Sequence, residues 1–171
     1  MSPQRLSFEV KPIGYVRVPR CDEEVKSSPR GVEGEIEVLE EYAEGLKGIE
    51  GFSHLIVLAY LHKVTEEQRR TLLVRPMRLA RLGVPLESLP LVGVFCTDSP
   101  HRPNPLALTI VELKRVEGRR LIVSGLDLFD GTPVLDIKPY TPARRIEEPR
   151  TPAWYEELAE KLRKLGTSGE L

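Results

Sequence analysis

Cysteine and the side-chain amides are scarce in this 171-residue sequence, which has Cys21, Cys96, one Asn and two Gln. The cysteines lack metal-ligand spacing and His54, His62 and His101 lie far apart in the chain, so we expect no metal site. Cys96 is expected to be a small core residue. Few amides among many charges is a trend of thermophile proteins.

Long apolar runs are also missing. None approaches membrane-spanning length, and the N-terminal segment has no signal-peptide core. We therefore expect a soluble, cytoplasmic protein with no membrane partner. The chain has no Gly-x-Gly-x-x-Gly after a predicted strand and no phosphate-binding loop, which argues against a Rossmann-type cofactor domain.

Charge of one sign does not dominate the chain, which has 25 Lys and Arg against 26 Asp and Glu. It is therefore no generic binder of polyanions. Residues 63–81 are nevertheless basic, with six Lys and Arg against two Glu. This segment is either a solvated charged face or a surface for nucleic acid.

Alternating and continuous apolar runs predict seven or so strands. The predicted strands are Ser7–Val18, Gly34–Leu39, Phe52–His62, Leu91–Thr97, Leu106–Val116, Arg119–Leu126 and Pro133–Tyr140. Glu117-Gly118 is a hairpin turn signal between two of them. Short connections and few helices favour a mainly β fold, a small closed antiparallel β-barrel with short helices and a C-terminal helix. We expect a barrel domain over residues 1–145, and a linker with an amphipathic helix over residues 146–171.

Local signals predict the segments between the strands. These are a long loop over Pro19–Gly34, a helical turn over Glu40–Gly48, and Leu72–Leu79, which is either extended or helical. Thr65 and Gln68 fit a capping box that opens a short helix. Thr151 is expected to cap the last helix, with Pro152 at its first position. The apolar face of that helix comprises Trp154, Leu158, Leu162 and Leu165.

Two stiff polar loops interrupt the predicted strands, over Cys96–Pro105 and Asp127–Pro133. In the first loop, closely spaced prolines hold His101, Arg102 and Asn104 at defined angles. Such a loop loses little entropy on binding, which favours a role in recognition. Alternatively, the loop is a rigid connector in which Arg102 pairs with an acid.

The second loop places Asp127, Asp130 and the Thr132 hydroxyl at the end of a strand. It is either the rim of a pocket for a cationic or amine-bearing ligand, or a tight turn in which Asp130 bonds its own backbone amides. In the next strand, alternation puts three polar side chains on one face: Asp136, Lys138 and Tyr140. This face is either a proton-handling cluster or carries an internal Asp136–Lys138 pair.

Four segments carry a resemblance to a known family. KPIGYVR (11–17), EGLKGIEGFSHLIVL (44–58), GVFCTDSPHRPNP (93–105) and GLDLFDGTPVLDIKPY (125–140) resemble the TsaA/TrmO family. The resemblance implies an S-adenosylmethionine-dependent methyltransferase that acts on N6 of threonylcarbamoyladenosine beside the tRNA anticodon. It also implies a small β-barrel and a homodimer with the cofactor near the subunit interface.

The resemblance further implies roles for single residues. Cofactor contacts are expected from His62, Lys63, Asp98, Leu108, Asp127, Leu128, Phe129 and Asp130. Contacts with the substrate RNA are expected from His101, Arg102, Asn104, Lys138 and Tyr140, and phosphate contacts from Arg69, Arg70, Arg75, Arg78 and Arg102. Asp130 and Asp136 are the catalytic candidates, because the methylated nitrogen must lose a proton to a nearby base. Asp98 is a further candidate base, although it stands where the family commonly has Arg.

Two alternatives to tRNA methylation stay open. The first is a barrel that binds S-adenosylmethionine without transferase activity and acts as a sensor or partner protein. The second is a methyltransferase that acts on another substrate. In each case a sulfonium cation is compatible with carboxylates and an aromatic face, which the turn around Phe129 offers.

Overall fold

A computed structural model describes residues 6–166 of the chain. Its contacts divide these residues into two compact units, which we call the barrel unit (residues 6–62 and 106–140) and the inserted unit (residues 63–105 and 141–166). Within residues 6–166, no helix is long and apolar enough to cross a membrane.

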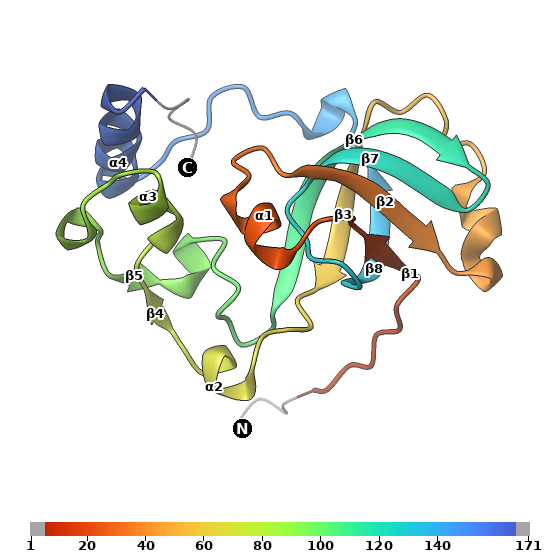
Figure 1. Cartoon of the computed structure of the whole chain (residues 1–171), viewed down its shortest axis with the longest axis horizontal. Helices are drawn as coiled ribbons and strands as arrows, with labels where there is room; N and C mark the ends of the chain where they lie inside the picture. The colour runs from red at the N-terminus through yellow and green to blue at the C-terminus, as the bar shows by residue number, and fades with distance from the viewer. Residues whose placement is uncertain (1–5, 167–171) are drawn as a thin grey trace. The chain divides into compact units, whose positions relative to one another are not determined.

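The barrel unit is a closed six-stranded antiparallel β-barrel with the strand order β1-β2-β7-β6-β3-β8 (Figure 1). Its strands are β1 (Gly14–Arg17), β2 (Val32–Val38), β3 (His54–Tyr60), β6 (Leu106–Glu117), β7 (Arg120–Leu126) and β8 (Pro133–Pro139). The fold class predicted from the alternating runs is therefore confirmed. The predicted hairpin turn joins β6 to β7 at Gly118, whose φ is 61°.

Alternation along each strand builds the core. In β3, Leu55, Val57 and Ala59 are fully buried, while the residues between them are only partly buried. Side chains with a period of two point to opposite faces of a sheet, so half of this apolar run fills the barrel and the other half lies on its outer face. The continuous apolar run over Phe52–His62 predicts a strand that is buried along its whole length, and the observed alternation corrects that prediction.

One end of the barrel, which we call the site rim, carries the loops in which the cofactor residues of the barrel unit are predicted. The antiparallel register brings together the C-terminal ends of β1, β3 and β7 and the N-terminal ends of β2, β6 and β8. Here α1 (Asp22–Ser27) connects β1 to β2 and buries Val25 in the core. Beside it Gly31 has a φ of 69°, and a Cβ there would lie 2.5 Å from the carbonyl carbon of Gly125. Two backbones meet at this point too closely for a side chain.

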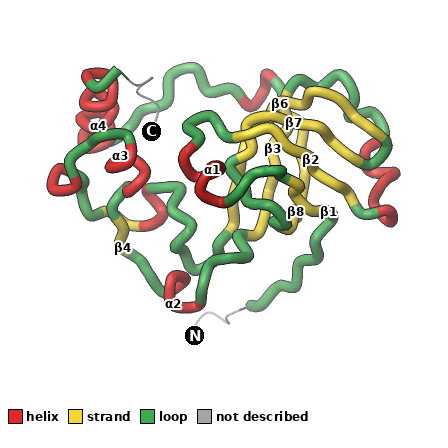
Figure 2. Tube along the Cα trace, viewed as in Figure 1, coloured by secondary structure: helices red, strands yellow, loops and turns green. Residues whose placement is uncertain are grey.

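The inserted unit is mostly loops and short helices (Figure 2). Its elements are α2 (Glu66–Arg69), β4 (Leu73–Val74), α3 (Met77–Arg81), η2 (Leu86–Ser88), β5 (Val92–Gly93), η3 (Val94–Cys96), η4 (Pro142–Arg144) and α4 (Ala153–Lys164). Both bonds of the predicted capping box at Thr65 and Gln68 are present. The unit has its own core, in which α4 contributes Leu158 and Leu162.

Several segments differ from the sequence-based expectation. The first strand is only Gly14–Arg17, and the expected loop over 19–34 contains α1, whose polar sequence buries a single residue. The expected strand over 91–97 is the two-residue β5 followed by a 3-10 turn. That turn leaves Cys96 exposed rather than in the core. Pro152, not Thr151, is the N-cap of α4, and no side chain caps this helix.

Candidate functional site

The site rim gathers the predicted cofactor residues of the barrel unit. His62 follows β3, Leu108 lies near the start of β6, and the turn 127–130 joins β7 to β8. In the register, Leu58 of β3 pairs with both Leu108 and Asp136, so these two side chains flank it on the outer face of the barrel. Neighbouring strands lie about 4.8 Å apart, which separates the strands of Leu108 and Asp136 by about 10 Å.

The turn 127–130 is held in place by backbone bonds to β1. The amide of Gly131 donates to Val16 O (2.9 Å), and the amide of Val16 donates to Thr132 O (3.0 Å). Leu128, which is 2% exposed, anchors the turn in the core. Asp127 is therefore presented at the surface of a fixed turn rather than of a mobile loop.

The side chain of Asp130 forms a hydrogen bond outside its own turn. Its Oδ1 accepts a hydrogen bond from the amide of Val18 (3.0 Å), which lies 112 residues earlier in the chain. Within the described residues, Oδ2 has no hydrogen-bond partner. The alternative in which Asp130 bonds amides of its own turn is therefore wrong, and one carboxylate oxygen remains available at the rim.

Phe129 already has a cation over its ring. The ammonium of Lys26 on α1 lies 5.6 Å from the ring centroid and also pairs with Glu23 at 2.6 Å. A positive charge at this distance is attracted by the ring quadrupole. This ammonium stands in for any cationic ligand group, and it shows that the face of Phe129 accommodates one.

The predicted polar face of β8 carries an internal ion pair. Lys138 Nζ lies 2.6 Å from Asp136 Oδ2, and Asp136 Oδ1 accepts the amide of Ile137 at 2.9 Å. Both oxygens of Asp136 are thus engaged. At the end of the strand, the Tyr140 ring meets the His54 ring edge-on, with the ring centroids 6.4 Å apart.

The remaining predicted residues belong to the inserted unit: Lys63, Asp98, His101, Arg102 and Asn104. Here the guanidinium of Arg102 ties its own loop together, because Nη2 donates to the carbonyls of Val94 (2.7 Å) and Thr97 (2.5 Å). The expected alternative, a pair with an acid, is wrong. Arg102 Nε is buried without a partner among the described residues. In the chain, His62 of the barrel unit directly precedes Lys63 of the inserted unit, and Pro105 directly precedes Leu106.

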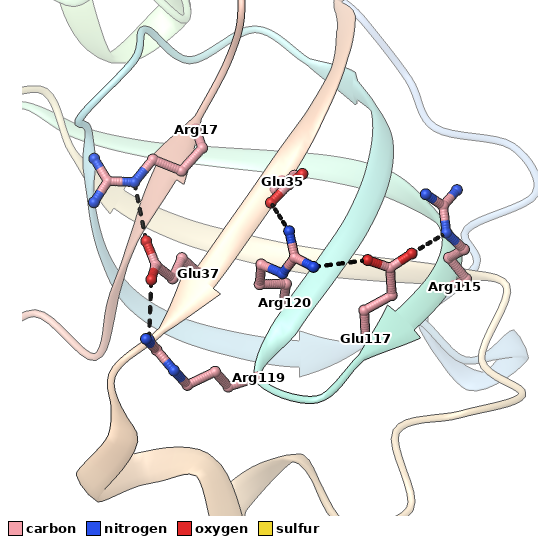
Figure 3. A network of polar contacts seen from close by, with 7 residues as sticks. All are labelled: Arg17, Glu35, Glu37, Arg115, Glu117, Arg119 and Arg120. Carbon is pink, nitrogen blue, oxygen red and sulfur yellow. Dashed lines mark hydrogen bonds and ion pairs between the residues drawn. The ribbon is translucent and has the colours of Figure 1, made fainter.

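An ion-pair network runs along the outer face of the barrel, from Arg17 at the end of β1 to the opposite rim, where β6 turns into β7 (Figure 3). Glu37 of β2 accepts from Arg17 (3.1 Å) and Arg119 (3.1 Å), and Arg120 of β7 joins Glu35 to Glu117. The hydrogen bond from Arg17 is the main cause that lowers the pKa of Glu37. A cavity of about 470 Å³ opens here, and none of the predicted site residues lines it. Because the charged side chains of this network are already paired with one another, we do not expect this rim to bind a charged ligand.

No three potential metal ligands cluster within residues 6–166. The contact between Lys26 and Phe129 could not be predicted from the sequence, because no local pattern connects residues so far apart in the chain. The prediction that the turn 127–130 lies at a strand end is confirmed.

Comparisons with known proteins agree with this architecture. The tRNA-methyltransferase O N-terminal domain family matches residues 17–144. A tRNA (adenine(37)-N6)-methyltransferase of Escherichia coli is 40% identical over 153 residues, covering 80% of this chain and 59% of that protein. An S-adenosyl-L-methionine-binding protein of Archaeoglobus fulgidus is 39% identical over 138 residues, covering 78% of this chain and 89% of that protein.

Solved structures give the same result. A crystal structure of TrmO matches with a TM-score of 0.64 and 31% identity, over 92% of this chain and 77% of that one. The TrmO of Pseudomonas aeruginosa matches with a TM-score of 0.59 and 33% identity, over 85% of this chain and 61% of that one. The chain thus spans less than two thirds of its bacterial relatives from Escherichia coli and Pseudomonas aeruginosa. With the family pattern covering most of the barrel, the chain belongs to the tRNA-methyltransferase O N-terminal domain family.

Proposed function

We propose that this protein is an S-adenosylmethionine-dependent methyltransferase that acts on N6 of threonylcarbamoyladenosine in tRNA, beside the anticodon. The observation that carries the proposal is the site rim of a family barrel, where His62, Leu108 and the turn 127–130 gather. The Escherichia coli relative named as a tRNA (adenine(37)-N6)-methyltransferase supports the choice of substrate.

The residues at the rim fit the cofactor. The ring face of Phe129 attracts the Lys26 ammonium, and a sulfonium would bind to this face by displacing that ammonium. The exposed carboxylates of Asp127 and Asp130 add negative charge on the same turn. S-adenosylmethionine, when bound, supplies an electrophilic methyl group, and we assign His62, Lys63, Asp98 and Leu108 with the turn 127–130 to its binding.

Asp130 is the proposed base. The acylated nitrogen of the substrate is a weak nucleophile, so its proton must pass to a base as the new N–C bond forms. Asp130 keeps Oδ2 without a partner among the described residues, whereas both oxygens of Asp136 are engaged by Lys138 and the amide of Ile137. We therefore assign Asp136 with Lys138 and Tyr140 to the substrate side, together with His101, Arg102 and Asn104.

Arg102 contributes in this proposal by shaping its loop. Its guanidinium holds the carbonyls of Val94 and Thr97, which fixes the segment that presents His101 and Asn104. Positioning supplies much of the rate of an in-line methyl transfer. We further propose a homodimer and a cytoplasmic location, as the family resemblance implies.

The experiment is incubation of tRNA containing threonylcarbamoyladenosine with the protein and S-adenosylmethionine, followed by mass spectrometry of the nucleosides. A methylated threonylcarbamoyladenosine supports the proposal. The second candidate is a cofactor-binding barrel without transfer, favoured by the name of the Archaeoglobus relative. Cofactor binding by titration calorimetry with no methylated nucleoside in any tRNA would select this second candidate.

A further inference from the structure

The two units carry opposite net charges. The barrel unit has 11 Lys and Arg against 16 Asp and Glu over its described residues, a net charge of −5. The inserted unit has 13 Lys and Arg against 9 Asp and Glu, a net charge of +4. A polyanion such as tRNA is attracted to the second and repelled by the first. The near neutrality of the whole chain hides this separation.

The inserted unit contains a cavity of about 260 Å³ between α4 and the loop that includes η2. Trp154 forms one wall, where it packs partly buried against the core of the unit and meets the ring of Tyr155 edge-on at 5.8 Å. The guanidinium of Arg75 holds another wall by donating to the carbonyl of Leu89. The cavity is thus built from fixed parts, including an aromatic side chain that is braced on one side.

Charged side chains of both signs line this cavity without pairing. Glu157 and Lys161 are four residues apart on α4, in the orientation that favours an ion pair, and Glu87 lies across from them on the loop. Among the described residues none of these three forms an ion pair, whereas Lys164 on the same helix pairs with Glu160 at 2.8 Å. The charged groups of the cavity are therefore available to a ligand.

The side chains that line this cavity indicate which class of ligand it can bind. An indole stacks with any base, Lys and Arg hold a phosphate, and carboxylates accept from the amino groups of guanine, adenine or cytosine. Two carboxylates oppose a bare phosphate ion. The volume of about 260 Å³ lies below the roughly 300–1,000 Å³ of small-molecule sites, so the cavity can enclose a base while the ribose and phosphate stay at its mouth. A single nucleotide whose base bears an amino group satisfies all of these conditions.

We propose that this cavity binds one unstacked nucleotide of the tRNA, a different nucleotide from the one that is methylated. The base lies against Trp154, its amino group donates to Glu157 or Glu87, and its phosphate contacts Lys161. The proposal rests on the proposed function, because it takes tRNA as the partner. Its α4 half lies beyond residue 144, where the match to the family model ends.

Intrinsic fluorescence tests the proposal directly, because Trp154 is the only tryptophan in the chain. Titration with GMP, AMP and CMP should quench it to saturation, UMP should act more weakly, and an anticodon stem–loop RNA should quench it most strongly. Absence of saturable quenching by every nucleotide and by the stem–loop overturns the proposal. Equal quenching by UMP also overturns the proposal, because the carboxylates would then not distinguish a base with an amino group from one without.

A charge-reversal pair gives the matched control. Lys161→Glu should weaken binding of the labelled stem–loop about tenfold, whereas Lys164→Glu should change it less than about twofold. Equal effects of both variants overturn the proposal, because they would reflect net charge alone. Trp154→Phe should retain most of the binding that Trp154→Ala loses, and equal circular dichroism spectra of the variants establish that they fold.

The outcomes separate this site from the proposed function. Calorimetry with S-adenosylmethionine and the nucleoside assay both report on the barrel, and Lys161→Glu should leave cofactor affinity unchanged. Methylation of tRNA with no tryptophan response would overturn the nucleotide site and leave the methyltransferase standing. A specific tryptophan response without methylation would support the site and remove the methyltransferase.

Discussion

The carboxylate of Asp130 accepts a hydrogen bond from the backbone amide of Val18 at 3.0 Å. This bond connects the turn between β7 and β8 to the end of β1, at the rim where β1 and β7 end and β8 begins. It uses only one carboxylate oxygen. A single side chain can therefore hold the turn and still present an acceptor to a ligand.

Replacement of this carboxylate should separate the two roles. We expect Asp130→Asn to keep the bond to Val18, because the amide oxygen still accepts, and to lower the rate of methyl transfer about 10²- to 10⁴-fold through loss of the base. Single-turnover kinetics measure the rate, and thermal unfolding reports on the turn. Asp136→Asn is the control and should cost far less. If Asp136→Asn abolishes transfer and Asp130→Asn does not, the assignment of the base is wrong.

Lys26 occupies the ring face that we assign to the cofactor. Lys26→Met should remove the competing ammonium and tighten binding of S-adenosylmethionine about two- to fivefold, which corresponds to one exposed cation–π contact. Calorimetry gives the dissociation constant. Lys47→Met removes a charge that follows the 3-10 helix η1 (Glu40–Leu46), which joins β2 to β3 on the opposite rim, and it should leave the affinity unchanged. Weaker binding by Lys26→Met would mean that the lysine supports the cofactor rather than competing with it.

The barrel could be predicted because most of its strands have a local sequence pattern that is typical of β-structure. The sequence of β3 is a continuous apolar run, and more and less buried residues alternate along β6 and the first part of β7, as a sheet with one face inside requires. The turn 127–130 was also predictable, since Asp-Gly and Thr-Pro are turn formers. Closure into a barrel was predicted from the short connections and few helices, whereas the strand order came only with the structure.

The missed elements lack such signals. Helix α1 has the sequence DEEVKS and buries only Val25, so no periodicity distinguishes it from a loop. The run 91–97 is apolar enough for a strand, yet it folds as a 3-10 turn that leaves Phe95 80% exposed. The contact of Lys26 with Phe129 and the cavity at Trp154 both join distant segments, which only the fold brings together. The division of the chain at residue 145 and the thermophile character stay predictions.

The close approach of Gly31 and Gly125 predicts a local stability effect. Gly31→Ala places a Cβ 2.5 Å from the backbone of Gly125 at a φ of 69°, so we expect a loss of about 1–3 kcal/mol in the free energy of unfolding. Urea titration measures it. Gly45→Ala is the matched control, because nothing lies within 4 Å of its Cβ and its residue sits in η1. A Gly31→Ala protein as stable as the control would show that the two strands can separate at this point.

The ion pairs of Figure 3 predict a pH dependence of stability. The hydrogen bond from Arg17 lowers the pKa of Glu37 below its ordinary value of 4.5. A lowered pKa in the folded state means that this glutamate stabilises the fold fully above about pH 4.5, and that the contribution is lost as the pH falls through the folded-state value.

Glu37→Gln should therefore lower the melting temperature most at pH 6, and the difference from the unchanged protein should shrink as the pH falls toward 3. Added salt at pH 6 should shrink it as well, because Glu37 and Arg17 are both partly exposed to solvent. Glu44→Gln, a change on η1 at a glutamate with no ion pair among residues 6–166, should show neither trend. A Glu37→Gln difference that is constant from pH 6 to pH 3 would assign the effect to packing instead of charge.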